Sequence, residues 1–289
     1  GSSPPPRRSS DGPQDRRAAA TYTMAKGSVM KFPDSSKRLG SVFWPIAVVL
    51  LASGCGGGGD GNVTGTQSAG IEGVWRGSCN DRVYTCILGI CVADEYRTVP
   101  AIAIATRDGR LHLFTATFEL AFIGQATVSD GRVTGTLRQV CDPLDGPPLF
   151  GHVSIDGSFT FQRSLDVSYD VDECIGDGVF NLEFDPTSRQ AASLSAIEGV
   201  WSSQQAAITI EQSGQMLGST GSGCQLSGKI TPGSDTANIF EVDMLVETCG
   251  ALDGQFSGLA TVTGDSTSSS TLLISTMRSG AIISIGLAR

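Results

Sequence analysis

The chain has 289 residues, of which 37 are glycine and 8 are cysteine, with 29 acidic against 20 basic side chains. This length allows one or two domains of ordinary size, and a glycine content of about 13%, against roughly 7% on average, favours β structure rich in turns. Residues 1–54 carry 8 of the basic side chains, and the rest carries 12 basic against 26 acidic. An acidic body with a single lysine, Lys229, argues against nucleic acid or an anionic membrane as an electrostatic partner.

The N-terminal part has the pattern of an export signal. Residues 1–29 are rich in Pro, Ser and Arg, and we expect them to be a non-native or disordered extension. From Met30, basic residues precede an apolar run over 42–51, which is too short for the roughly 20 residues of a membrane-spanning helix. The pattern predicts a signal peptide over 30–54.

The end of this segment, Ala52-Ser53-Gly54-Cys55, resembles the lipobox of bacterial lipoproteins, although the usual leucine three places before the cysteine is Ala52 here. The resemblance implies that Cys55 becomes the first mature residue and carries acyl chains such as palmitate. Gly56, in place of the aspartate that favours inner-membrane retention, implies the outer membrane. A plain cleaved signal is the alternative. Residues 55–70 are rich in glycine and predict a flexible tether.

A five-residue repeat divides the remainder. Ile-Glu-Gly-Val-Trp occurs at 71–75 and again at 197–201. A repeated pentapeptide that contains tryptophan indicates two tandem modules, β module 1 over 71–190 and β module 2 over 197–289. Two copies do not make a solenoid, which needs at least three repeats.

Both modules show the pattern of antiparallel β structure. Apolar runs flank three Asp-Gly pairs at 108–109, 130–131 and 156–157, a pattern that predicts hairpin turns. Apolar and polar residues alternate over 240–247, and Ser279-Gly280 predicts a last hairpin. No segment after Cys55 combines helical periodicity with helical length. We therefore expect an all-β fold: two small tandem meander barrels or curled sheets of seven to nine strands each.

Two further resemblances follow from these residues. Gly73 and Trp75 resemble the Gly-x-Trp of the first strand of lipocalin-type barrels, where tryptophan plugs the closed end, although an ordinary core tryptophan explains the same residues. The pattern of 71–289, with a cysteine-glycine strand at 223–228, Cys249 and a Phe-Ser-Gly-Leu-Ala strand at 256–260, resembles proteobacterial outer-membrane lipoproteins with tandem Gly-x-Trp β modules. That resemblance implies no activity.

The cysteines suit an oxidising compartment. Module 2 holds only Cys224 and Cys249, which a hairpin turning at 233–238 brings opposite each other, so we expect a disulfide and no metal. Module 1 holds five, for which we expect two bridges and one buried free thiol, with the pairing left open: Cys79, Cys86, Cys91, Cys141 and Cys174. A zinc site is the competing interpretation.

Candidate catalytic groups are few. His112 and His152 both fall in predicted strands, and His112 shares a face with Phe114 and Phe118, so we expect a packed or rim side chain. No Gly-x-Ser-x-Gly motif occurs. The acidic cluster of Asp166, Asp170, Asp172, Glu173 and Asp177 contains weak calcium candidates or a carboxylate pair for glycoside hydrolysis, and a solvated acidic loop explains it equally well.

These observations predict an envelope protein without a cofactor or enzymatic activity. The membrane is reached through a lipidated Cys55, and the partner is an envelope protein or a small ligand. The alternatives are a lipocalin-like carrier of a small apolar ligand and an inhibitor of a lysozyme-like enzyme.

Overall fold

The computed structural model describes residues 70–289 apart from 88–89, 117–119, 142–148, 173–175 and 265–269. The expected extension, signal peptide and most of the tether, with Cys55, therefore lie outside the described residues. Within the described part, no helix is both long enough and apolar enough to cross a membrane.

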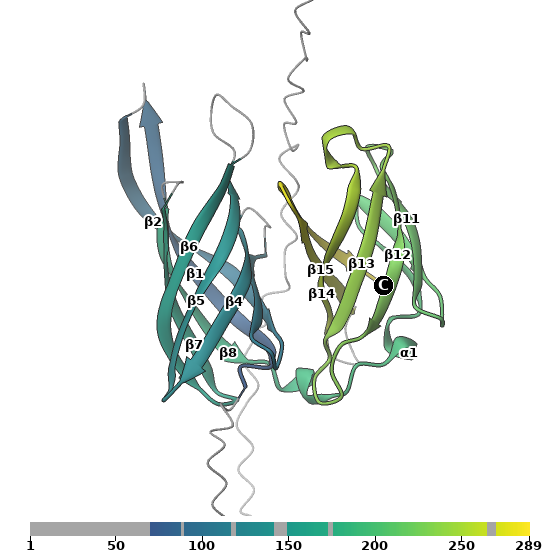
Figure 1. The fold of residues 1–289 in the computed structure, drawn as a ribbon, viewed down its shortest axis with the longest axis horizontal. Coiled ribbons are helices and arrows are strands. Elements are labelled where there is room, and N and C mark those ends of the chain that lie inside the picture. The colour runs from purple at the N-terminus through teal and green to yellow at the C-terminus, as the bar shows by residue number, and fades with distance from the viewer. Residues whose placement is uncertain (1–69, 88–89, 117–119, 142–148, 173–175, 265–269) are drawn as a thin grey trace, which may run out of the picture. The chain divides into compact units, whose positions relative to one another are not determined.

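Two closed barrels follow one another along the chain (Figure 1). In each, every strand pairs with the next in antiparallel fashion, and the last pairs with the first. Barrel 1 consists of β1 (Gly73–Ile87), β2 (Ile90–Ala105), β3 (Arg110–Thr115), β4 (Ala121–Ser129), β5 (Arg132–Cys141), β6 (Leu149–Thr160), β7 (Ser164–Val171) and β8 (Asp177–Phe184). Barrel 2 consists of β9 (Gly199–Ser202), β10 (Ala206–Ile210), β11 (Gln215–Thr220), β12 (Gln225–Pro232), β13 (Phe240–Glu247), β14 (Gly254–Thr263), β15 (Thr271–Arg278) and β16 (Ala281–Ala288).

The all-β tandem fold and the meander order are confirmed, and each barrel has eight strands. The short helices η1 (Pro186–Arg189) and α1 (Leu194–Ile197) belong to the segment between the barrels, and η2 (Gly250–Leu252) joins β13 to β14. Closure pairs the first strand with the last, over residues 75–81 of β1 in barrel 1 and through Ser202 and Ala288 in barrel 2. Such pairing of the edge strands is how a small β module avoids pairing with other chains.

Most of the predicted turns are confirmed. Asp130 and Gly131 join β4 to β5 with φ of 51° and 75°, the two positive values that a tight hairpin requires. Asp108-Gly109 lies between β2 and β3, and Ser279-Gly280 joins β15 to β16.

The turn predicted at Asp156-Gly157 is wrong, because β6 continues through both residues to Thr160. The reason for the glycine is close approach of the next strand. A Cβ at Gly157 would lie 1.9 Å from the carbonyl oxygen of Asp166 on β7. The chain turns instead after Thr160, where Gln162 takes a φ of 50°.

The repeated pentapeptide builds the same feature in both barrels. Trp75 is buried and its Nε1 donates to the carbonyl oxygen of Ile71 over 3.0 Å. Trp201 is buried likewise and donates to Ile197 over 2.7 Å. The tryptophan thus fills the interior near the start of the first strand, with its one polar atom satisfied.

The barrel interiors are filled by side chains. In barrel 1, Phe122, Tyr169 and Phe180 form an aromatic cluster with ring centroids 4.8–5.8 Å apart. In barrel 2, β13 points its apolar residues inward as the alternation predicted: Phe240, Val242, Met244 and Val246, each at most 1% exposed. Full burial of one such side chain stabilises the fold by about 1.5–3 kcal/mol.

The disulfide between Cys224 and Cys249 is confirmed, with a Cα–Cα distance of 4.8 Å. It joins the residue before β12 to a residue just after β13, as the register of these two strands requires. Cys79 on β1 is free and buried, which agrees with the one buried thiol expected in module 1. The side chains of the other four cysteines of that module lie outside the described residues.

An apolar interface joins the outer surfaces of the two barrels. We define the inter-barrel interface as the cluster formed by outward side chains of barrel 1 with residues of barrel 2: Val74, Ile102, Ile104 and Phe114 with Ala237, Ile239, Leu259 and Leu273. Each is at most 8% exposed.

The repeat is used differently on this outer surface. Val74 and Val200 occupy the same place in the pentapeptide, yet Val74 is 1% and Val200 is 61% exposed. In barrel 1, Ile104 lies between Val74 and His112 across three strands, and all three are buried. In barrel 2, Thr209 lies in the equivalent row between Val200 and Leu217, and all three are exposed. The modules therefore share an interior pattern but not an outer one.

Candidate functional site: the inter-barrel cleft

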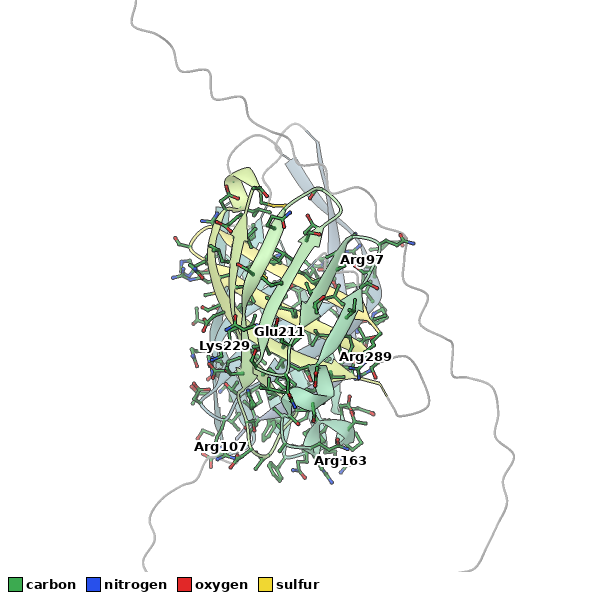
Figure 2. The ribbon with its side chains drawn as sticks, turned by 90° about the vertical axis from the view of Figure 1, so that its right-hand side faces the viewer. Arg97, Arg107, Arg163, Glu211, Lys229 and Arg289 are labelled. Carbon is green, nitrogen blue, oxygen red and sulfur yellow. A yellow bond between two sulfur atoms is a disulfide. The ribbon has the colours of Figure 1, made fainter. Side chains whose placement is uncertain are left out.

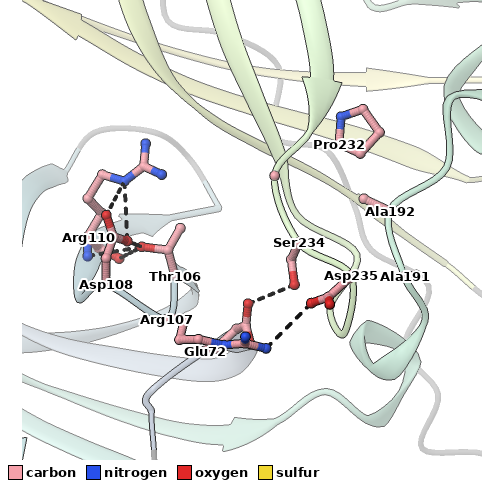
Figure 3. Close-up of a pocket in the computed structure, with 11 residues that line it drawn as sticks. Glu72, Thr106, Arg107, Asp108, Arg110, Ala191, Ala192, Pro232, Ser234 and Asp235 are labelled. Atoms are coloured by element: carbon pink, nitrogen blue, oxygen red, sulfur yellow. Dashed lines mark hydrogen bonds and ion pairs between the residues drawn. The ribbon is translucent and has the colours of Figure 1, made fainter.

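A cleft opens beside the inter-barrel interface. It has a volume of about 660 Å³, it is open to solvent, and both barrels and the connecting segment contribute to it (Figure 3). We call it the inter-barrel cleft and define it by its lining residues: Glu72, Thr106, Arg107, Asp108, Arg110, Ala191, Ala192, Pro232, Gly233, Ser234 and Asp235. Its volume lies within the range of ordinary ligand sites.

Turns position the polar side chains of the cleft. Arg107 and Asp108 belong to the β2–β3 turn, where Gly109 has a φ of 88° and lies so close to β4 that a Cβ would meet the carbonyl oxygen of Ala126 at 2.3 Å. Ser234 and Asp235 belong to the β12–β13 connection. The Ser234 carbonyl accepts from the amide of Ala192 over 3.3 Å, which holds this connection against the segment between the barrels.

Glu72 lines the cleft and forms hydrogen bonds between the two barrels. Its carboxylate accepts from the hydroxyls of Ser234 over 2.7 Å and Thr236 over 2.8 Å. Its equivalent in the repeat, Glu198, is exposed instead. The carboxylate of Glu72 is only 15% exposed, so these bonds satisfy a charge that is largely removed from water.

Arg107 lines the cleft and its side chain is 65% exposed; Figure 2 labels it at the lower end of the ribbon. Its Nη2 donates to Thr236 over 3.0 Å and to Glu72 over 3.3 Å, and lies 3.5 Å from Asp235. Nε and Nη1 of Arg107 have no partner among the described residues. The guanidinium thus bridges the barrels and keeps donors for another molecule.

Arg110 forms a second polar contact across the interface. Its Nη2 donates to Glu241 on β13 over 2.6 Å, and its Nε lies 3.3 Å from Asp108. Desolvation lowers the pKa of Arg110, but the hydrogen bond and charge of Glu241 outweigh it and raise the pKa overall. A hydrogen bond from Thr106 lowers the pKa of Asp108. Both groups are therefore fully ionised at neutral pH.

His112 lies between the barrels, not in the cleft. It is 3% exposed and its Nδ1 has no hydrogen-bond partner. Burial, followed by the charge of Arg110, lowers its pKa to about 3, against the opposing effect of a hydrogen bond to the backbone of Ser275. This agrees with the packed histidine expected beside Phe114, whereas Phe118 lies outside the described residues.

A polar group of side chains lies inside barrel 1, toward the end opposite Arg107. Tyr169 donates to Asp81 over 2.6 Å, and Arg97 donates to the same carboxylate over 3.3 Å. Burial, and next the charge of Asp81, raises the pKa of Cys79 to about 12. Burial also raises the pKa of Tyr169. These groups satisfy one another, and the protonated thiol is unreactive.

The weak calcium candidates do not form a metal site in the described part of the chain, where no three His, Cys, Asp or Glu side chains gather suitably. Asp170 and Asp177 are opposite each other on β7 and β8, and Asp177 lies 3.5 Å from Arg82. Asp172 is exposed, and Glu173 is outside the described residues. Asp166 and His152 lie on β7 and β6.

The sequence did not predict the cleft. Its residues come from turns and connections up to 163 positions apart, from Glu72 to Asp235, and no spacing rule joins them. One signal was present. Residues 101–105 read Ala-Ile-Ala-Ile-Ala and 111–114 read Leu-His-Leu-Phe, which is apolar on both faces of a strand except for His112. Such runs indicate strands buried on both sides, and hence a partner for the outer surface.

Comparison with known proteins adds little. No protein-family model and no curated protein matches the chain. Among solved structures, one named "putative outer membrane protein", from Bacteroides fragilis NCTC 9343, aligns with 77% of this chain and 99% of its own, at 14% identity and a TM-score of 0.29. A similarity at that level carries no argument about fold or function.

Proposed function

We propose that this chain is a lipid-anchored protein of the bacterial outer membrane with a non-enzymatic binding role, exercised at the inter-barrel cleft. The lipobox-like residues ending at Cys55 support the anchor. The disulfide between Cys224 and Cys249 supports an oxidising compartment such as the periplasm.

The observation that supports the binding role is that the open volume lies between the barrels and not inside them. Their interiors are occupied by side chains without accessible surface, among them Leu111, Leu113, Leu137, Leu165 and Val167 in barrel 1. Such packing gives no support to a carrier that holds its ligand inside a barrel. The cleft, in contrast, is hollow and brings hydrogen-bonding groups of both barrels together.

Binding fits the chemistry of the cleft better than catalysis. A general acid or base works best with a pKa near the operating pH. The pKa of Asp108 moves down and that of Arg110 moves up, so each moves away from neutrality. Asp108 and Arg110 therefore stay charged at neutral pH, which suits hydrogen bonding to a bound molecule better than proton transfer.

The anchor is tested by fractionating cells that express the native chain or Cys55→Ser. We expect the native protein in the outer membrane and the variant released from it, because serine lacks the sulfur to which the lipobox resemblance assigns the lipid. Thr66→Ser in the tether is the matched control. Unchanged fractionation of Cys55→Ser would refute the anchor.

The site is tested by photo-cross-linking in intact cells. A photoreactive residue replaces Ala191, which lines the cleft and is exposed, or Gln215, which is exposed on β11 away from it. We expect a discrete, saturable adduct from position 191 only. Equal adducts from both positions, or none from 191, would count against the cleft as the binding site.

A further inference from the structure

The cleft offers hydrogen-bonding capacity that the protein does not use. Among the described residues the hydrogen bonds of Arg107 all involve Nη2, which leaves Nε and Nη1 as free donors. Asp235 is 85% exposed and has one 3.5 Å contact, which leaves most of its acceptor capacity open. The side chain of Asp108 is 63% exposed, and its carboxylate already accepts from the hydroxyl of Thr106 and lies 3.3 Å from Nε of Arg110, so it has part of its acceptor capacity left. Donors and acceptors of the two barrels therefore line the same hollow.

The charges of the cleft oppose ionic ligands of either sign. Glu72, Asp108 and Asp235 face Arg107 and Arg110, so the lining has one more negative than positive charge. An anion that approaches Arg107 meets the carboxylates of Glu72 and Asp235 within 3.5 Å of the same nitrogen. A cation that approaches Asp235 meets the guanidinium of Arg107. An uncharged molecule avoids both repulsions and leaves the ion pairs intact.

The remaining surface of the cleft is apolar and small. Ala191 and Ala192 from the connecting segment and Pro232 from the end of β12 form part of the lining. They can contact the C–H groups of a ring while the polar side chains reach its hydroxyls. Hydroxyl groups both donate and accept, so they match a lining that contains both guanidinium donors and carboxylate acceptors.

We propose that the inter-barrel cleft binds a neutral, polyhydroxylated ligand, a short oligosaccharide. Arg107 donates to its hydroxyl oxygens, and Asp235 and Asp108 accept from its hydroxyl groups. This inference rests on the proposed binding role and specifies the chemical class of the ligand.

The test is isothermal titration of the purified full chain with trisaccharides of matched size and different charge. The neutral probes are maltotriose, cellotriose and triacetylchitotriose. Trigalacturonic acid is the anionic probe, and deacetylated chitotriose is the cationic one. We expect at least one neutral probe to bind more tightly than either charged probe.

Asp235→Ala is the diagnostic variant, because its side chain is the most exposed of the cleft carboxylates and its contact with Arg107 across the barrels is a long one of 3.5 Å. We expect roughly tenfold weaker binding of the neutral probe, as for loss of a hydrogen bond to a charged group. Asp243→Ala, exposed on β13 outside the cleft, should bind as the native chain does.

Tighter binding of a charged probe would overturn the neutral class. Binding of no neutral probe at about 10 mM would overturn it as well, and so would equal loss in Asp235→Ala and Asp243→Ala. In any of these cases a cleft-specific adduct at position 191 in cells would still uphold the binding role, so the two failures are distinguishable.

Discussion

Acidification should lower the free energy of unfolding of the protein because of His112. In the folded state burial and then the charge of Arg110 hold its pKa at about 3, against 6.5 as the ordinary value. Glu241 and Asp108 are the acidic side chains bound to Arg110. Because the folded pKa is depressed, the unfolded chain takes up a proton first. Stability is therefore complete above pH 6.5 and declines as the pH falls from 6.5 toward 3. At about 1.36 kcal/mol per pH unit, the whole interval costs at most about 5 kcal/mol.

The measurement is urea unfolding, followed by tryptophan fluorescence, of the native chain and His112→Leu between pH 7 and pH 4.5. The carboxylates titrate equally in the native chain and in His112→Leu, so the difference between the two pH profiles of stability reports on His112. At pH 4.5 the native chain should have lost about 2.5 kcal/mol more than the variant, relative to pH 7. Parallel pH profiles would refute the reasoning. So would a proton resonance of the His112 ring that titrates near pH 6.5 in the folded protein.

Three further predictions concern the interface and the cysteines. Val74→Asp should separate the barrels, because it places a charge at a site that is 1% exposed, whereas Val200→Asp, at the same place in the repeat but 61% exposed, should not. Limited proteolysis at the connection 185–198 would distinguish the two variants, and equal cleavage of both would contradict the interface. Replacing Cys224 and Cys249 together by alanine should lower the unfolding free energy of barrel 2 by about 2–4 kcal/mol. The measurement is urea unfolding of the variant and the native chain without reductant, and an unchanged midpoint would contradict a stabilising role of this disulfide. Cys79 should resist alkylation by iodoacetamide at pH 8 until the protein unfolds, because it is buried and its pKa is about 12. Rapid labelling of Cys79 in the folded chain would be inconsistent with that burial.

Local patterns predicted the barrels well. Asp130-Gly131 and the alternation over 240–247 are signals of neighbouring residues, and both appear as expected. The turn predicted at Asp156-Gly157 was wrong because glycine occurs in a sheet for two reasons. The sequence around Gly157 does not distinguish a turn from the close approach of a neighbouring strand.

The cleft was beyond such patterns because it depends on how the barrels dock. Glu72 and Ser234 meet only after each barrel has closed and the two outer surfaces have packed. The difference between Glu72 and Glu198, identical in local sequence, shows that the role of this residue is set by its distant neighbours.

The unequal outer surfaces of the two modules limit how far the chain can assemble. A contact between two different faces of related units is heterologous, and when every unit carries both faces it can propagate into an open filament. Here barrel 1 presents Ile102 and Phe114 at the positions where barrel 2 presents Ala207 and Ser219. Small and polar residues at these positions remove the apolar face from the second unit. The contact between the two barrels therefore cannot be repeated from barrel 2 to a further barrel, although the two modules share a repeated sequence.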